Sequence, residues 1–251
     1  MKLKMYVLKF SLVSYLLAAV LSGFAAAYEP IGVVDWVHQC GSVDRDTSQD
    51  MCGLPDGSFY ITGWYENRYD PSIPYTSEPH DFGLRDIVLS KYDAQGELLW
   101  IRSAGSGHCD VSGAVVALPD GTCALTGAYG YGTASCTFGY GQPNQTTLIG
   151  IGRFDVCVAK YNGDGILQWA KRAGGPEPDY GGDVALAPDG SVYVAGQFGP
   201  SITFGHGLPN QTTLTNPSPG STAFFLARYD TAGTFEWAKS VYVWRVIALS
   251  D

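Results

Sequence analysis

Short runs of apolar residues recur along most of the chain, and turns rich in glycine separate them. The run Val115–Leu118 ends just before an Asp-Gly pair at 120–121, and the run Val192–Ala195 follows another pair at 189–190. Asp-Gly favours a tight β-hairpin turn, because glycine adopts positive φ at little cost. No apolar stripe at helical spacing follows residue 28, so the pattern predicts many short β-strands.

The pattern repeats along the chain. Trp36, Trp100, Trp169 and Trp237 are separated by 64, 69 and 68 residues, and the Asp-Gly pairs that begin at 56, 120 and 189 are separated by 64 and 69. Two registers that agree in this way predict three tandem units of about 68 residues. We interpret the repeated tryptophans as packing between units, with ligand contact as the alternative.

Each unit is predicted to hold four strands, A to D. Strand A precedes the Asp-Gly pair, strand B follows it, strand C comes after a longer connection, and strand D holds the tryptophan. Four thin antiparallel strands bury both faces only by stacking on neighbouring units, as propeller blades do. The predicted strands are A at Val115–Leu118 and Val184–Ala187, B at Phe59–Thr62 and Val192–Ala195, and C at Ile87–Tyr92, Val156–Tyr161 and Phe224–Tyr229.

The predicted fold is therefore all-β: a β-propeller-like array of four-stranded antiparallel blades, incomplete, with about three blades plus partial strands at each end. Residues 28–46 hold a leading strand D, and residues 241–251 begin a fourth blade. Blades 1, 2 and 3 are assigned to residues 47–103, 104–172 and 173–240. Three blades do not close a ring, so we expect a piece of a longer protein, with closure by several chains as the alternative.

Residues 1–27 have the features of a secretory signal peptide. Three lysines (Lys2, Lys4 and Lys9) precede an apolar stretch at 11–24, and small residues at 25–27 offer a cleavage site. The apolar stretch is shorter than the roughly 20 residues of a membrane span. We expect a secreted, extracellular or cell-surface protein, with the periplasm left open, and no membrane insertion after cleavage.

The charge excludes some partners. The whole chain carries a net charge of −9, from 15 basic and 24 acidic residues, and loss of the three lysines of the signal peptide makes it 12 − 24 = −12. Nucleic acids and anionic membranes need clustered basic residues, so neither is expected as a partner. The partner is unknown from the sequence, with protein or carbohydrate at the cell surface as candidates.

Six cysteines lie in the first two units. An exported chain permits disulfides, and six cysteines allow 15 pairings, which the sequence leaves open. Cys40 with Cys52 is one plausible pair across a single loop.

The segments Asp86–Trp100 and Asp155–Trp169 share the motif D-[IV]-x-[VL]-[AS]-K-Y-[DN]-x-x-G-x-L-x-W. On this motif the chain resembles the bacterial β-propeller repeats called SBBP repeats. The third copy departs from it, with Ala223 in place of the aspartate and Arg228 in place of the lysine. The resemblance implies a secreted or surface protein of the S-layer-like kind, and it supplies no catalytic residues.

The connections between strands B and C are candidate binding loops, because long loops on a rigid scaffold often carry function. Two of them share the hexapeptide PNQTTL, each preceded by Thr-Phe-Gly. The alternative is an extra hairpin in which these segments form small strands. The candidate binding residues are Phe138, Asn144, Thr146, Phe204, Asn210 and Thr212.

Asp46, Asp110 and Asp179 recur at one position between strands D and A. A ring of carboxylates would suit a cation, but a carboxylate that accepts backbone N–H bonds in a turn is the interpretation preferred here. We therefore predict a non-catalytic scaffold with no cofactor and no assigned metal site. The alternatives are a quinone-cofactor propeller oxidoreductase and a calcium-stabilised adhesin.

Overall fold

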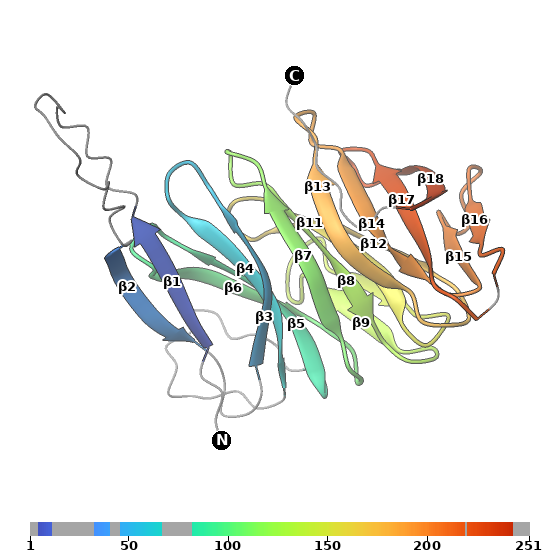
Figure 1. Cartoon of the computed structure of the whole chain (residues 1–251), viewed down its shortest axis with the longest axis horizontal. Helices are drawn as coiled ribbons and strands as arrows, with labels where there is room; N and C mark the ends of the chain where they lie inside the picture. Colours follow the sequence, from blue (N-terminus) through green and yellow to red (C-terminus); the bar gives the residue numbers. More distant parts are fainter. Residues whose placement is uncertain (1–4, 12–32, 41–45, 67–81, 219, 243–251) are drawn as a thin grey trace, which may run out of the picture.

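The computed structural model describes residues 5–11, 33–40, 46–66, 82–218 and 220–242, and in the first two segments it describes the backbone alone. These residues form strands and turns, which confirms the all-β prediction (Figure 1). None of them forms a helix long and apolar enough to cross a membrane.

Three units each contribute four antiparallel strands in the predicted order A to D. Blade 1 forms the sheet β3-β4-β5-β6, blade 3 forms β13-β14-β17-β18, and blade 2 contributes β7, β8, β11 and β12. The bounds are β3 Asp46–Gly53, β4 Phe59–Glu66, β5 Arg85–Tyr92, β6 Leu98–Ala104, β7 Val111–Ala117, β8 Cys123–Tyr129, β11 Asp155–Tyr161, β12 Leu167–Gly174, β13 Tyr180–Leu186, β14 Val192–Phe198, β17 Ala223–Tyr229 and β18 Phe235–Val241.

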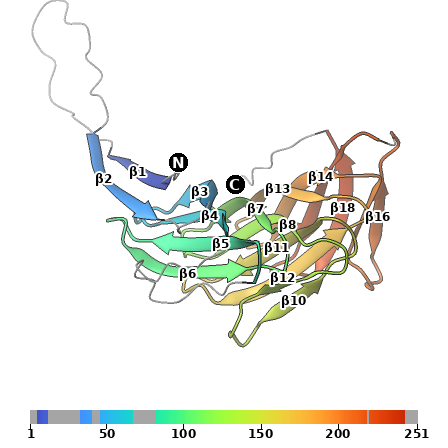
Figure 2. The ribbon, with the colours of Figure 1, turned by 90° about the horizontal axis from the view of Figure 1, so that it is seen from below.

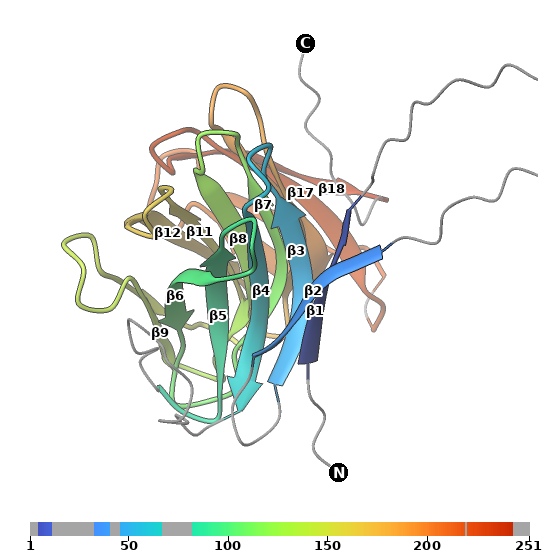
Figure 3. The same ribbon diagram turned by 90° about the vertical axis from the view of Figure 1, so that its left-hand side faces the viewer.

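The blades stand face to face in an open row. Strand β7 packs on β3 and β4 of blade 1, and β13 of blade 3 packs on β7 and β8. Figure 3 looks along the row, with the strands of blade 1 in front. The described blades form a propeller-like array that does not close into a ring.

The B-to-C connections of blades 2 and 3 form extra hairpins, which was the alternative interpretation of these loops. Their strands are β9 (Ser135–Phe138), β10 (Thr146–Ile149), β15 (Ser201–Phe204) and β16 (Thr212–Thr215). Each hairpin crosses to the preceding blade: Thr137 of β9 bridges to Gly105, and Phe204 of β15 pairs with Ala173 of β12. Figure 2 shows β10 along β12 and β16 along β18, so each hairpin also borders strand D of its own blade.

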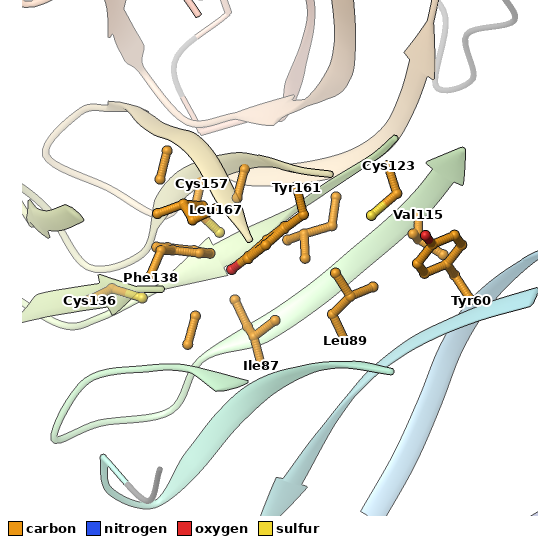
Figure 4. Close-up of a cluster of buried hydrophobic side chains, with 14 of the residues drawn as sticks. Tyr60, Ile87, Leu89, Val115, Cys123, Cys136, Phe138, Cys157, Tyr161 and Leu167 are labelled. Carbon is orange, nitrogen blue, oxygen red and sulfur yellow. The ribbon is translucent and has the colours of Figure 1, made fainter. Parts of the chain in front are cut away.

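The two larger hydrophobic cores lie between blades. The first core combines Tyr60 and Leu89 of blade 1 with Leu125 and Tyr161 of blade 2, all at most 1% exposed (Figure 4). A second core joins blades 2 and 3 in the same way. Because each of these two cores draws on two blades, packing between neighbouring blades contributes much of the buried apolar surface.

The tryptophans of blades 1 and 2 lie at these junctions. Trp100 and Trp169 are 8% and 7% exposed. A Cβ atom on Gly165 or Gly233, in the C-to-D turn of the following blade, would lie 2.8 or 2.6 Å from the facing indole ring. Trp237 is half-buried, and its ring stands edge-on to Tyr193 at 6.2 Å between centroids.

Three sequence predictions touch the ends of the chain. Strand β2 (Val33–Cys40) holds Trp36 and pairs with β1 (Met5–Ser11), which lies inside the predicted signal peptide. The predicted cleavage site and nearly all of the predicted fourth blade lie outside the described residues.

The suggested disulfide between Cys40 and Cys52 needs correction, because Cys52 is a free thiol. The other cysteines with described side chains, Cys109, Cys123, Cys136 and Cys157, are also free thiols.

Candidate functional site

Two of the predicted binding residues belong to the core. Phe138 and Phe204 are 0% and 1% exposed. The ring of Phe204 stands edge-on to Phe225 and stacks on Phe235, with centroid distances of 5.1 and 5.8 Å. Burial removes both phenylalanines from the surface. They anchor the hairpins instead of making the binding contacts that the sequence had suggested.

The predicted asparagines and threonines brace the hairpins. The Asn144 side chain donates to the carbonyl oxygen of Leu167 at 3.0 Å, and the Asn210 side chain donates to that of Phe235 at 2.6 Å. Each asparagine thereby ties its hairpin turn to strand D of its own blade. Thr146 and Thr212 donate to the carbonyl oxygens of these asparagines, at 3.0 and 3.1 Å.

A pocket of about 380 Å³ lies beside the second hairpin. Its walls come from strand β12 of blade 2, the turn between β15 and β16, and the turn between β17 and β18 of blade 3. Leu148 of the first hairpin also lines it, so the pocket joins two blades and both hairpins. Ligand pockets occupy about 300–1,000 Å³, and this one falls in that range.

The pocket combines an apolar floor with positive charge. Leu148, Tyr229 and Phe235 supply buried apolar surface. Lys171 and Arg172 supply two cations from adjacent positions of β12. Together they suit a ligand with an anionic group and an apolar body.

His206 contributes a neutral imidazole to the same pocket. Burial, and secondarily the nearby Arg172, lower the pKa of His206 below its ordinary value. The ring is therefore uncharged at neutral pH, with one nitrogen that donates and one that accepts.

Beside the pocket, blade 3 departs from the repeat at one hairpin position. In blade 2, Gln142 receives a hydrogen bond from the backbone N–H of Leu167 at 2.6 Å and donates to the carbonyl oxygen of Gly165 at 2.9 Å. In blade 3 the equivalent residue is Leu208, which has no polar group to place there. The space that the glutamine amide fills in blade 2 is thus part of the pocket in blade 3.

Arg172 is a second departure from the repeat. It stands three residues after Trp169, where the other units carry Ser103 and Ser240. The strand register is equivalent, since Arg172 pairs with Cys157 as Ser103 pairs with Val88. Arg172 is not among the residues predicted from the sequence, although an arginine aligned with two serines in the other units distinguishes this position.

Two of the three recurring aspartates, Asp110 and Asp179, accept hydrogen bonds from backbone N–H groups, as the turn interpretation expects. Asp110 is 0% exposed and accepts hydrogen bonds from the backbone N–H groups of Ser106 at 2.6 Å and Gly130 at 2.9 Å. Asp179 is also 0% exposed and accepts from Gly199 at 3.2 Å. Asp46 opens β3 and is half-buried.

Burial raises the pKa of both buried carboxyls, to about 7 for Asp110 and about 8 for Asp179. Among the residues that the structure describes, no three His, Cys, Asp or Glu side chains gather as a metal site.

No family model matches the chain. An uncharacterized WD repeat-containing protein of Acanthamoeba polyphaga mimivirus is 24% identical over 270 residues, which cover 86% of this chain and 19% of the viral protein. The Regulatory protein FlaEY of Caulobacter vibrioides is 28% identical over 143 residues, which cover 57% of this chain and 14% of that protein.

The chain spans less than a fifth of the length of each of these two relatives. A WD repeat protein among the relatives agrees with the four-stranded blades seen here. The blade architecture and these similarities together support a repeat family of the propeller type.

Proposed function

We propose that this chain is a non-catalytic binding scaffold, exported to the cell surface or beyond, built from blades of the SBBP kind. The observation that carries the proposal is the pocket between β12 and the β15–β16 hairpin. It is formed where Leu208 and Arg172 depart from the repeat. Residues that a repeat framework does not need for folding are candidates for function.

The position of the pocket favours binding over cofactor chemistry. It lies beside strand D, at the opposite edge of the blade from strand A. A quinone-type propeller enzyme would hold its cofactor on the axis of a ring, near the A strands. The hairpin edge instead offers an accessible site for a partner.

Binding is tested by passing a panel of glycans and proteins over the immobilised chain. We expect at least one class to bind the unaltered chain and to bind the Leu208→Gln variant more weakly, because glutamine fills the equivalent space in blade 2. A parallel assay adds a quinone cofactor, calcium and a redox dye. Dye reduction by the chain, with no binding in the panel, would overturn the scaffold proposal.

Export is tested separately by expressing the full-length chain and determining its N-terminus by mass spectrometry. We expect a chain that begins at Tyr28, recovered outside the cytoplasm, because residues 25–27 are the predicted cleavage site. A protein that keeps Met1 and stays in the cytoplasm would contradict export while leaving the binding test unaffected.

A further inference from the structure

The outer face of blade 3 repeats the face that blade 1 turns toward blade 2. Each face carries a tyrosine, a cation and a tryptophan that lie directly opposite one another on strands B, C and D: Tyr60, Lys91 and Trp100 in blade 1, and Tyr193, Arg228 and Trp237 in blade 3. Residues that lie directly opposite in neighbouring strands share one face of a sheet. Each trio therefore forms a row across one face of its blade.

The side chains of the two rows are arranged alike. The rings of Tyr60 and Trp100 lie 5.6 Å apart between centroids, and those of Tyr193 and Trp237 lie 6.2 Å apart. A cation stands over each tyrosine ring, 5.4 Å from the centroid in blade 1 and 5.5 Å in blade 3. A second cation stands over each tryptophan ring, at 5.4 and 5.3 Å. Blade 3 thus presents the blade 1 arrangement on its outer face.

In blade 1 these side chains bind two glycine-containing turns of blade 2. Tyr60 donates to the carbonyl oxygen of Gly121, in the A-to-B turn, at 2.6 Å. Lys91 and Trp100 donate to the carbonyl oxygen of Gly163, in the C-to-D turn, at 3.1 and 3.0 Å. The row in blade 1 is therefore a set of donors that fits the two turns of the following blade.

Blade 3 ends the described row of blades (Figure 1). No hydrogen bond from the Tyr193 hydroxyl, the Trp237 indole N–H or the Lys239 ammonium group is found among the described residues. The two aromatic side chains are half-buried and Lys239 is exposed. Leu226 on the same strand as Arg228 is also half-buried, whereas its blade 1 equivalent, Leu89, is 1% exposed. Apolar surface that is covered in one unit and open in another indicates a docking face.

Blades 1 and 3 share two further residues that blade 2 lacks. Asp50 of blade 1 accepts a hydrogen bond from the Val115 N–H, on strand A of blade 2, at 2.9 Å. Blade 3 carries Asp183 at the position of Asp50, whereas blade 2 carries Ala114. At the tyrosine position blade 2 carries Ala124. The face of blade 3 therefore matches a blade that docks as blade 2 docks on blade 1.

A blade that follows β18 in the same polypeptide would reach this face directly. Residues 105–110 join β6 to β7, and residues 175–179 join β12 to β13. Both short connections place strand A of the next blade against the preceding blade. A blade from another molecule would lose translational and rotational freedom on docking, a cost that a covalent connection largely removes.

We propose that the outer face of blade 3 receives a fourth blade of the blade 2 kind, which follows β18 in the same polypeptide. The A-to-B turn of that blade accepts a hydrogen bond from Tyr193, and its C-to-D turn accepts one from Trp237. The receiving face consists of Asp183, Tyr193, Leu226, Arg228, Trp237 and Lys239. This inference concerns the assembly of blades and does not depend on ligand binding in the pocket beside β12.

The test extends the chain by one unit directly after Val241. One extended chain carries a copy of blade 2, residues 105–173, and a second carries a copy of blade 3, residues 174–241. NMR measures hydrogen exchange of the Trp237 indole N–H, which is assigned from the Trp237→Phe variant of each chain. We expect the copy of blade 2 to slow this exchange at least about tenfold relative to the 251-residue chain, and the copy of blade 3 to slow it less.

A double variant exchanges the preference. Asp183→Ala with Tyr193→Ala gives blade 3 the alanines that blade 2 carries at these positions, so the face should still fold. We expect this variant to lose most of the protection given by the copy of blade 2, and to be protected better by the copy of blade 3, which naturally faces these alanines. Thr215→Ala, an exposed residue of β16, is the control and should change neither result.

Fast exchange of the Trp237 indole N–H in both extended chains, or equal protection by the two copies, would overturn the inference. An extension that unfolds the chain would also overturn it, because a blade that fits this face should stabilise the row. Ultracentrifugation of the 251-residue chain tests the source of the partner. Self-association that protects Trp237 without any extension would replace the fourth blade with a second copy of this chain.

Discussion

Trp100 donates its indole N–H to the carbonyl oxygen of Gly163 in the next blade, at 3.0 Å. Lys91 donates to the same oxygen at 3.1 Å. Trp169 repeats the relationship one blade later, with the carbonyl oxygen of Thr231 at 3.1 Å. The tryptophans of blades 1 and 2 thus hold the C-to-D turn of the following blade by a hydrogen bond as well as by apolar contact.

Trp100→Phe should destabilise the junction between blades 1 and 2. The variant keeps an aromatic ring but removes the indole N–H and leaves a void, for an expected loss of about 1–3 kcal/mol in the free energy of unfolding. Urea denaturation followed by circular dichroism measures the change. Trp237→Phe is the matched control, because no hydrogen bond from the Trp237 indole N–H is found among the described residues. An equal loss of stability in both variants would contradict the junction role of Trp100.

Gly233→Ala should destabilise the chain more than Gly207→Ala. Both glycines have positive φ, 79° and 77°, so alanine is strained by about 1–2 kcal/mol at either position. At Gly233 the new Cβ atom would lie 2.6 Å from the Trp169 ring. At Gly207 no atom lies within 4 Å of the new Cβ atom. We expect a further loss of about 1–3 kcal/mol for Gly233→Ala in thermal or urea unfolding. Equal losses would show that the indole does not press on this turn.

Asn210→Ala should loosen the second hairpin. The Asn210 side chain donates to the carbonyl oxygens of Phe235 and Glu236 at 2.6 and 3.2 Å, and its loss costs about 0.5–1.5 kcal/mol. Hydrogen exchange of the β15–β16 amides should become several-fold faster while the core strands keep their protection. Thr215→Ala, on the exposed end of β16, is the control. Unchanged exchange in Asn210→Ala would mean that strand pairing alone holds the hairpin.

Asp179 should make stability fall as the pH rises. Burial raises its pKa in the folded state to about 8, above the value of about 4 for an unfolded chain, so the folded state binds more protons between these values. The free energy of unfolding therefore decreases from about pH 4 to about pH 8 and then levels off.

The Asp179→Asn variant isolates this contribution. It removes the titration and keeps an oxygen for the Gly199 N–H, so it should gain about 1–4 kcal/mol relative to the unaltered chain between pH 4 and pH 8. Urea denaturation at a series of pH values measures the difference. A difference that stays constant with pH would refute the titration of Asp179.

The strand plan of each unit was predictable from local signals. Alternating apolar residues and Asp-Gly turns predicted the strands around Gly121, whose φ is 84°, and the tryptophan register predicted the repeat. These signals are local because a turn depends on the conformations its own residues adopt, and alternation depends on the two faces of one strand. Side chains such as Phe138 were misplaced because a loop motif does not show whether its aromatic ring points inward.

The sequence by itself determined the blades, their four strands and their tandem order. Only the tertiary structure decided that each hairpin crosses to the preceding blade, as Phe204 does when it pairs with Ala173. That crossing brings Arg172, Leu208 and Tyr229 together around one pocket, although they belong to separate segments of the chain. Contacts of this kind depend on how stacked sheets meet in space, which the spacing of residues along a single strand does not encode.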